Sequence, residues 1–121
     1  MDRFLATAGL MGAVAIGLGA FGAHALKPVL AIIPEANAWW TTATFYLLLH
    51  AIAVAAITSS SNPQTLALAK LSWISGAFIF SSTLYAMSLG APHWLGAVAP
   101  IGGSLMIVGW VFLLWSARAK S

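Results

Sequence analysis

Four long apolar runs divide the chain, and they constrain its fold more than any other feature. They extend over residues 4–26, 38–58, 71–89 and 95–115, and none of them contains a charged side chain. An α-helix of that length crosses the ~30 Å hydrocarbon core of a bilayer at 1.5 Å per residue. The runs predict an all-α, polytopic membrane protein with four transmembrane helices in an up-down bundle, formed as a single domain by residues 1–121.

The composition agrees with insertion in a bilayer. Hydrophobic residues make up 61% of the chain and charged residues only 6%, whereas about a quarter of an ordinary soluble domain is charged. This balance excludes a soluble enzyme and a disordered chain, and scattered basic residues do not make a surface for nucleic acid. The alternating polarity of a transmembrane β-barrel is not present. Cysteine is also missing, which excludes disulfides, thiolate nucleophiles and cysteine-bound metals.

Basic residues are distributed unevenly between the two sides of the expected bundle. Arg3, Lys70, Arg118 and Lys120 lie on the side of the termini, and Lys27 alone lies on the other. The positive-inside rule therefore predicts that both termini are cytoplasmic, in a bacterial inner membrane. The tryptophans are expected near the membrane boundaries: Trp39, Trp40 and Trp94 at the outer one, and Trp73, Trp110 and Trp115 at the inner one.

The connecting segments carry predictions of their own. Residues 27–37 are too apolar for water and too short to span, so we expect them at the outer interface or folded over the mouth of the bundle. Asn62 and Pro63 are typical of an N-cap and a first helical residue, which places the start of the third helix before the bilayer. The Pro-Ile-Gly-Gly stretch that begins at Pro100 marks a place where the fourth helix can kink.

The first apolar run is rich in small residues, which form two faces at helical spacing. Such faces allow close approach by neighbouring helices, so helix one is expected at the centre of the bundle. One face consists of Ala8, Gly12, Ala15, Gly19 and Gly22, and the other of Gly9, Ala13, Gly17, Ala20 and His24. The predicted helix-packing glycines are Gly12, Gly19, Gly22, Gly102 and Gly103.

Polar side chains are expected to gather in the outer half of the bundle. Tyr46 and His50 share one face of the second helix at i, i+4, and Ser81 and Tyr85 share one face of the third. These residues predict a polar region that opens toward the non-cytoplasmic side. The predicted polar cluster consists of His24, Tyr46, His50, Ser81, Ser82 and Tyr85.

Two interpretations of His50 remain open. An ionised imidazole near mid-span would be costly, so the ring is expected to be neutral. An intramembrane ionisable residue can mark a functional site, but a neutral histidine that bonds across helices is also an ordinary packing element. In the second case, the expected partner lies in the turn formed by residues 81–85.

The polar residues do not form a recognisable catalytic or metal-binding set. Because none of the four runs contains a carboxylate, a His–Asp proton relay and a hydrolase triad each lack a member. Histidines can ligate haem or copper, but His24 and His50 differ in depth, and His93 follows a proline. We therefore predict no catalytic residue, no metal ligand and no cofactor, and a protein that is not an enzyme.

An ordered series of motifs resembles one known family. The motifs lie at residues 19–26, 42–51, 80–85, 100–103 and 109–110, beginning with Gly-Ala-Phe-Gly-Ala-His at residue 19. They are similar to the bacterial inner-membrane family catalogued as domain of unknown function number 423, related to eukaryotic transmembrane protein 256. The chain departs from the family pattern at Ser82, commonly glycine, and at Ala99, commonly threonine. The resemblance implies a four-span inner-membrane protein and no particular reaction.

Two functions are compatible with these observations. The first is a small, non-enzymatic accessory, assembly or structural subunit of a membrane complex or homo-oligomer, since two small-residue faces exceed what one neighbour needs. Its expected partners are the lipid bilayer and other membrane proteins or itself. The alternative is a binder or conduit for a small lipophilic molecule, a lipid or a quinone, in the outer-half polar pocket. A cavity that reaches the polar cluster from the lipid or from the outer surface would favour the alternative.

Overall fold

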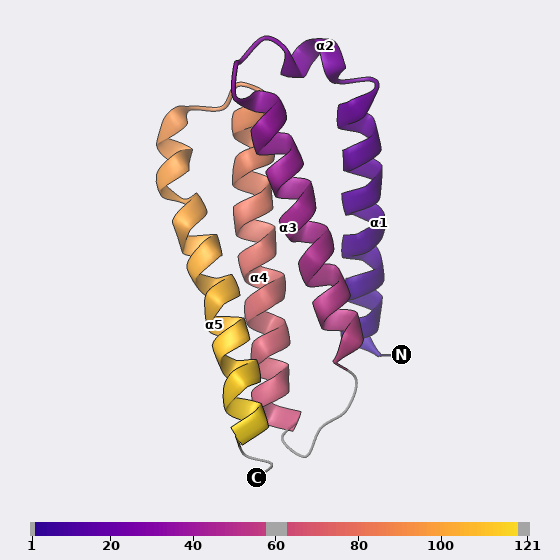
Figure 1. The fold of residues 1–121 in the computed structure, drawn as a ribbon, viewed down its shortest axis with the longest axis vertical. Coiled ribbons are helices and arrows are strands. Elements are labelled where there is room, and N and C mark those ends of the chain that lie inside the picture. Colours follow the sequence, from indigo (N-terminus) through magenta and orange to yellow (C-terminus); the bar gives the residue numbers. More distant parts are fainter. Residues whose placement is uncertain (1, 58–62, 119–121) are drawn as a thin grey trace.

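The computed structural model describes residues 2–57 and 63–118, and every regular element in this part of the chain is helical. Four long helices run alternately up and down, and two short ones lie in connections at one end (Figure 1). Each long helix can cross a membrane by length and composition, which confirms the predicted four-helix transmembrane bundle. The elements are α1 (Arg3–Ala23), α2 (Lys27–Leu30), α3 (Ala36–Ala56), α4 (Pro63–Ser88), the 3-10 helix η1 (His93–Ala97) and α5 (Ala99–Arg118).

Local sequence signals set the ends of the helices. The Asp2 side chain caps α1, since its Oδ1 accepts hydrogen bonds from the backbone nitrogens of Phe4 (2.9 Å) and Leu5 (3.1 Å). The C-terminal end of α4, the longest of the described helices, is followed by a turn at Gly90, where the backbone has a φ of 103°. This left-handed conformation is open to glycine without strain, so the turn ends the helix.

Prolines in the first turn explain where two of the long helices begin. Pro63 is the first residue of α4 and Pro100 is the second residue of α5. A proline in these positions sacrifices no helical hydrogen bond. Helix α4 therefore begins well before residue 71, as its proline predicts, while the expected cap at Asn62 lies outside the described residues. Pro100 begins a helix here and does not kink one.

Helix α4 lies at the centre of the bundle and packs along both α3 and α5, whereas α1 packs mainly against α3 (Figure 1). The prediction that helix one is central is therefore wrong. Helix α1 uses only one of its small-residue faces inside the chain. Ala8 and Ala15 of that face are buried in the core, while Gly9 and Gly17 of the other face have open space beside them.

Two glycines bring the backbones of α4 and α5 into contact. A Cβ atom on Gly102 would lie 2.5 Å from the Phe80 nitrogen, and one on Gly76 would lie 2.7 Å from the Gly102 oxygen. Neither position has room for a side chain. Gly103, by contrast, has nothing within 4 Å of a Cβ atom, so its predicted packing role is wrong within this chain.

The predicted packing glycines of α1 all face α3. A Cβ atom on Gly19 would lie 3.1 Å from Thr44 Cγ2, and one on Gly12 would lie 4.0 Å from the Ala51 Cβ. Gly22 is the tightest of the three, because the Trp40 indole lies directly against it. The closeness of the α1–α3 contact thus depends most on the end of α1 near α2.

The segment between α1 and α3 folds over the end of the bundle, as its apolar composition predicts (Figure 1). Leu30 of α2 is buried together with Ala36 and Trp40 of α3. Leu18 of α1 and Tyr85 of α4 pack against this cluster. Apolar side chains from four elements therefore cover this end of the bundle.

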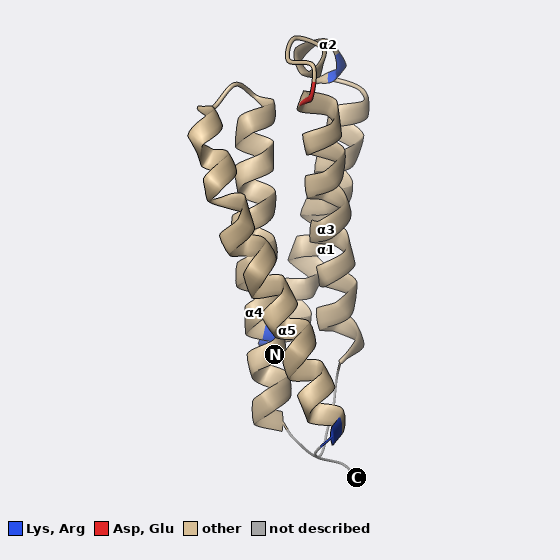
Figure 2. Cartoon of the chain, turned by 60° about the vertical axis from the view of Figure 1, so that its left-hand side comes forward, with Lys and Arg blue, Asp and Glu red and all other residues tan. Residues whose placement is uncertain are grey.

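Charged residues gather toward the two ends of the described bundle, and its long middle carries none (Figure 2). Large apolar side chains cover the outside of the middle: Ile16 is 63% exposed, Phe78 68% and Ile107 65%. A surface with this composition is favourable in contact with lipid chains and unfavourable in water. The outside of the four helices is therefore the surface that contacts the bilayer.

Candidate functional site

The polar residues predicted to form one cluster are divided between two sides of the bundle. Three of the predicted residues, Ser81, Ser82 and Tyr85 of α4, line a groove between α1 and α4, named the α1–α4 groove. Two others, Tyr46 and His50 of α3, line a recess between α3 and α5, named the α3–α5 recess. His24 belongs to neither, because it is exposed at the end of α1. The prediction of a single cluster is wrong, because Tyr46 and His50 line an opening toward α5, whereas Ser81 and Tyr85 line an opening toward α1.

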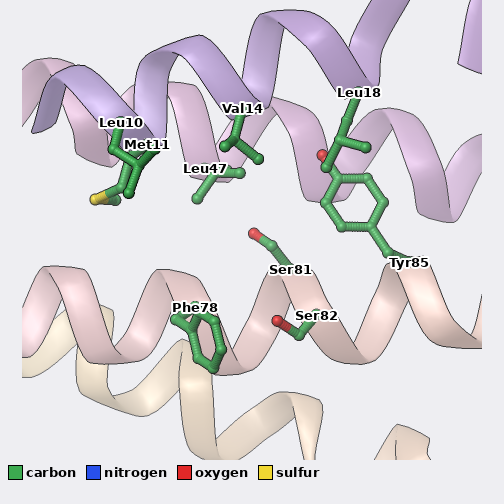
Figure 3. Close-up of a pocket in the computed structure, with 9 residues that line it drawn as sticks. All are labelled: Leu10, Met11, Val14, Leu18, Leu47, Phe78, Ser81, Ser82 and Tyr85. Atoms are coloured by element: carbon green, nitrogen blue, oxygen red, sulfur yellow. The ribbon is translucent and has the colours of Figure 1, made fainter. Parts of the chain in front are cut away.

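The α1–α4 groove is almost wholly apolar, with a volume of about 240 Å³. Its hydroxyls are largely used within the bundle: Ser81 donates to the Ala43 oxygen (3.1 Å), and the Tyr85 and Thr44 hydroxyls are 2.7 Å apart. Figure 3 shows apolar side chains of α1 facing the polar residues of α4 across the groove. The lining residues are Leu10, Met11, Val14, Leu18, Leu47, Phe78, Ser81, Ser82 and Tyr85.

Serines of α4 join this helix to α3. Ser81 bonds to the Ala43 oxygen, and Ser88, seven positions on, donates to the Ala36 oxygen at 3.0 Å. The donors step up α4 while the acceptors step back along α3, as antiparallel helices require. Sequence reasoning missed Ser88, although its spacing of two helical turns from Ser81 is the signal that would have found it.

His50 of α3 is 2% exposed, and both of its ring nitrogens are hydrogen-bonded. Its Nδ1 lies 2.8 Å from the Tyr46 carbonyl oxygen, and its Nε2 lies 3.1 Å from Trp110 Nε1 of α5. An indole nitrogen only donates, so Nε2 is the acceptor and Nδ1 carries the proton. This is a neutral imidazole that links α3 to α5. The prediction that His50 bonds to a residue among 81–85 of α4 is wrong, because its partner on another helix is Trp110 of α5.

The α3–α5 recess has a volume of about 310 Å³ and faces outward at the level of His50. Three rings form its aromatic wall: Tyr46, Phe80 and Trp110. Three other side chains form its aliphatic wall: Leu49, Met106 and Ile107. Gly103 completes the lining and leaves open space at its α-carbon. Both openings are lined by aromatic and hydrogen-bonding side chains, but only this recess contains a histidine and a tryptophan.

Trp73 of α4 and Trp110 of α5 both lie at the level of His50, whereas the sequence predicted both near a membrane boundary. The Trp73 ring centroid is 4.6 Å from that of Trp110 and 6.4 Å from that of His50. The Trp73 indole is fully buried against Gly109, and its Nε1 has no hydrogen-bond partner among the described residues. Trp40, in contrast, donates from Nε1 to the Leu18 oxygen of α1 at 2.7 Å.

The two indoles allow a prediction that compares the same substitution at Trp40 and at Trp73. Trp40→Phe and Trp73→Phe remove the same atoms from two buried side chains, but only Trp40→Phe also removes a hydrogen bond. We expect Trp40→Phe to be the more destabilising change by about 1–2 kcal/mol. Unfolding of both purified variants in the same detergent measures the difference. Equal losses would show that the bond to Leu18 contributes nothing.

The described residues offer positioned hydrogen bonds and apolar walls, and no group of three or more His, Asp or Glu side chains among them could hold a metal ion. The three histidines considered for ligation differ in setting. His24 is exposed, His50 is hydrogen-bonded at both ring nitrogens, and the His93 ring lies 5.8 Å from the Trp39 ring, centroid to centroid. An arrangement of this kind can hold helices together and bind an uncharged molecule.

Comparison with known proteins finds a family described as "Protein of unknown function (DUF423)", which matches residues 18–103. A UPF0382 membrane protein of Haemophilus influenzae is 34% identical over 123 residues, covering 99% of this chain and 98% of its own. Proteins of the same description are 30% identical in Bacillus subtilis (97% of each chain) and 34% identical in Schizosaccharomyces pombe (88% of this chain and 94% of its own). No solved structure matches the chain.

Proposed function

Because the chain belongs to the UPF0382 (DUF423) family of membrane proteins, whose function is described as unknown, we propose its function from its geometry. It is a small, non-enzymatic accessory, assembly or structural subunit of a membrane complex or of a homo-oligomer. The observation that supports this proposal is a small-residue face of α1 that no other part of the described chain covers.

The uncovered face lies opposite the face of α1 that packs on α3. Its members are exposed and follow one another at helical spacing: Gly9, Ala13, Gly17 and Ala20. Gly9 and Gly17 have nothing within 4 Å of a Cβ atom. Each glycine costs about 1 kcal/mol of helix propensity relative to alanine, so a lipid-facing helix gains nothing from them.

Small residues four positions apart are typical of a surface on which another transmembrane helix packs. In lipid, helix association depends on close packing of backbones, and Gly9, Ala13 and Gly17 permit such an approach. Larger apolar residues, Ile16 and Phe21, flank this face and are 63% and 50% exposed. A partner helix that fits between these flanks would bury the face.

We also propose that the chain lies in a bacterial inner membrane with both termini in the cytoplasm. Arg3 is the first residue of α1 and Arg118 the last of α5, and the Lys70 ammonium lies over the Phe4 ring, so these three lie toward the end of the bundle opposite α2. Lys27 is the first residue of α2 itself. Lys120 lies outside the described residues. The positive-inside rule assigns the first end to the cytoplasm. The test is a reporter enzyme that is active only outside the cytoplasm, fused to either terminus. Activity of such a fusion would contradict this orientation.

A pair of identical substitutions tests the proposed association. Ala13→Leu places a bulky side chain on the uncovered face, while Ala55→Leu makes the same change at an exposed position of α3. We expect Ala13→Leu to weaken association about tenfold or more, which corresponds to about 1.4 kcal/mol. Energy transfer between labelled copies in bilayers measures self-association, and affinity purification from native membranes measures association with other proteins.

Ala55→Leu should retain the association of the unsubstituted chain in both measurements. A protein that is strictly monomeric in bilayers and retains no other protein on purification would contradict the proposal. Equal weakening by the two leucine variants would contradict the assignment to α1.

A further inference from the structure

The α3–α5 recess has the size and lining of a small-molecule site. Its volume of about 310 Å³ lies within the range of about 300–1,000 Å³ for such sites, while the α1–α4 groove falls below it. The Tyr46 and Phe80 rings of its aromatic wall meet edge to face, with centroids 5.2 Å apart. Gly103 leaves the space open, because any larger residue there would project into it.

The Tyr46 hydroxyl is a hydrogen-bond donor without a partner among the described residues. Tyr46 is the middle residue of α3 (Ala36–Ala56), so about 15 Å of helix separates it from either end. A tyrosine side chain is much shorter than this distance and cannot reach water or lipid headgroups. A donor left unpaired in hydrocarbon is costly, which indicates an acceptor supplied from outside this chain.

The other polar atoms of the recess are already committed. Trp110 donates to His50, and His50 donates to the Tyr46 carbonyl oxygen. Phospholipid ester carbonyls lie at the membrane interface, far from the middle of α3. A neutral molecule that dissolves in the hydrocarbon core can supply the missing acceptor at this depth, and an acceptor on another copy of the chain is an outcome that the experiment below distinguishes.

We propose that the α3–α5 recess binds a ring ketone of the quinone class. Its flat ring lies against the aromatic wall, where offset and edge-to-face contacts favour an aromatic or quinoid ring. One ring carbonyl accepts a hydrogen bond from the Tyr46 hydroxyl, and an alkyl tail follows the aliphatic wall toward the lipid. The recess is formed by α3, α4 and α5, so this site does not rest on the association proposed for α1.

Binding of a benzoquinone with a short alkyl tail, measured by equilibrium dialysis of the protein in lipid nanodiscs, tests the proposal. We expect saturable binding that an alkylbenzene of the same tail length, which has no carbonyl, does not compete for. Tyr46→Phe removes only the unpaired hydroxyl and should weaken binding about tenfold. Gly103→Leu fills the recess and should abolish binding.

The matched control is Tyr85→Phe, which removes a hydroxyl on the opposite side of the bundle and should leave quinone affinity unchanged. The proposal is overturned if uptake is non-saturable, if Tyr46→Phe binds as well as the unsubstituted chain, or if both tyrosine variants weaken binding equally. It is also overturned if Tyr46→Phe lowers self-association, because the acceptor would then lie on another copy. Unfolding of each variant in detergent establishes that it is folded.

Discussion

Gly102→Ala is expected to destabilise the bundle by about 3 kcal/mol, the upper end of the usual cost of overpacking. The added methyl group would lie 2.5 Å from the Phe80 nitrogen and 2.7 Å from the Gly76 oxygen. Both obstacles are backbone atoms of α4, which cannot rotate aside as a flexible side chain can. The helices would have to separate, and α5 would lose its contact with the central helix of the bundle.

The neighbouring substitution Gly103→Ala provides the control. Nothing lies within 4 Å of a Cβ atom at Gly103, and both changes gain the same helix propensity. Gly103→Ala should therefore be neutral or stabilising by up to about 1 kcal/mol. Denaturant unfolding of the two variants in one detergent measures the difference. Similar stabilities would show that α4 and α5 do not approach closely at Gly102.

His50→Leu is expected to destabilise the protein by about 2–3 kcal/mol. Leucine has no acceptor, so the Trp110 N–H loses its partner at a depth where water is not available. His50 is also 2% exposed, so its replacement disturbs a packed position between α3, α4 and α5. The loss should be measurable as a lower midpoint of thermal unfolding in detergent.

His50→Gln separates the hydrogen bond from the ring. A glutamine oxygen can accept a hydrogen bond from Trp110, and its amide nitrogen can donate one to the Tyr46 carbonyl oxygen. We therefore expect His50→Gln to lower the free energy of unfolding by less than about 1 kcal/mol. Hydrogen bonds between transmembrane helices contribute about 0.6 kcal/mol on average. If both variants were as stable as the unsubstituted chain but lost a bound molecule or a cellular function, His50 would be a site residue and not a packing element.

The division of the predicted polar cluster shows which features of a site helical periodicity can predict and which it cannot. Spacing at i, i+4 correctly placed Tyr46 with His50 on one face, and Ser81 with Tyr85 on another. It could not show that the first pair lines an opening toward α5, while the second bonds to α3 and lines an opening toward α1. That outcome depends on the rotation of each helix about its own axis, which follows from packing against neighbours and not from the apolar pattern of an all-round hydrophobic helix.

The position of helix one illustrates the same limit. Small residues predict that a helix will be approached closely, and one face of α1 is approached by α3 through Gly19 and Gly22. The same residue types on the other face, at Gly9 and Gly17, meet nothing within the described chain. Composition alone does not distinguish a face buried inside a chain from a face available to a partner, because both are built from the same small residues.

By itself, the sequence determined the number of spans, their up-down order, the early start of the third long helix at Pro63 and the neutral state expected of His50. These follow from local chemistry: backbone groups in lipid must bond within a helix, and a charge at mid-span is too costly. Only the tertiary structure decided that α4 is central, that Trp110 is the partner of His50, and that Gly102 packs while Gly103 does not. Neighbouring positions on a helix differ by about 100° in direction, so the rotation of α5 about its own axis decides which glycine meets α4 and which does not.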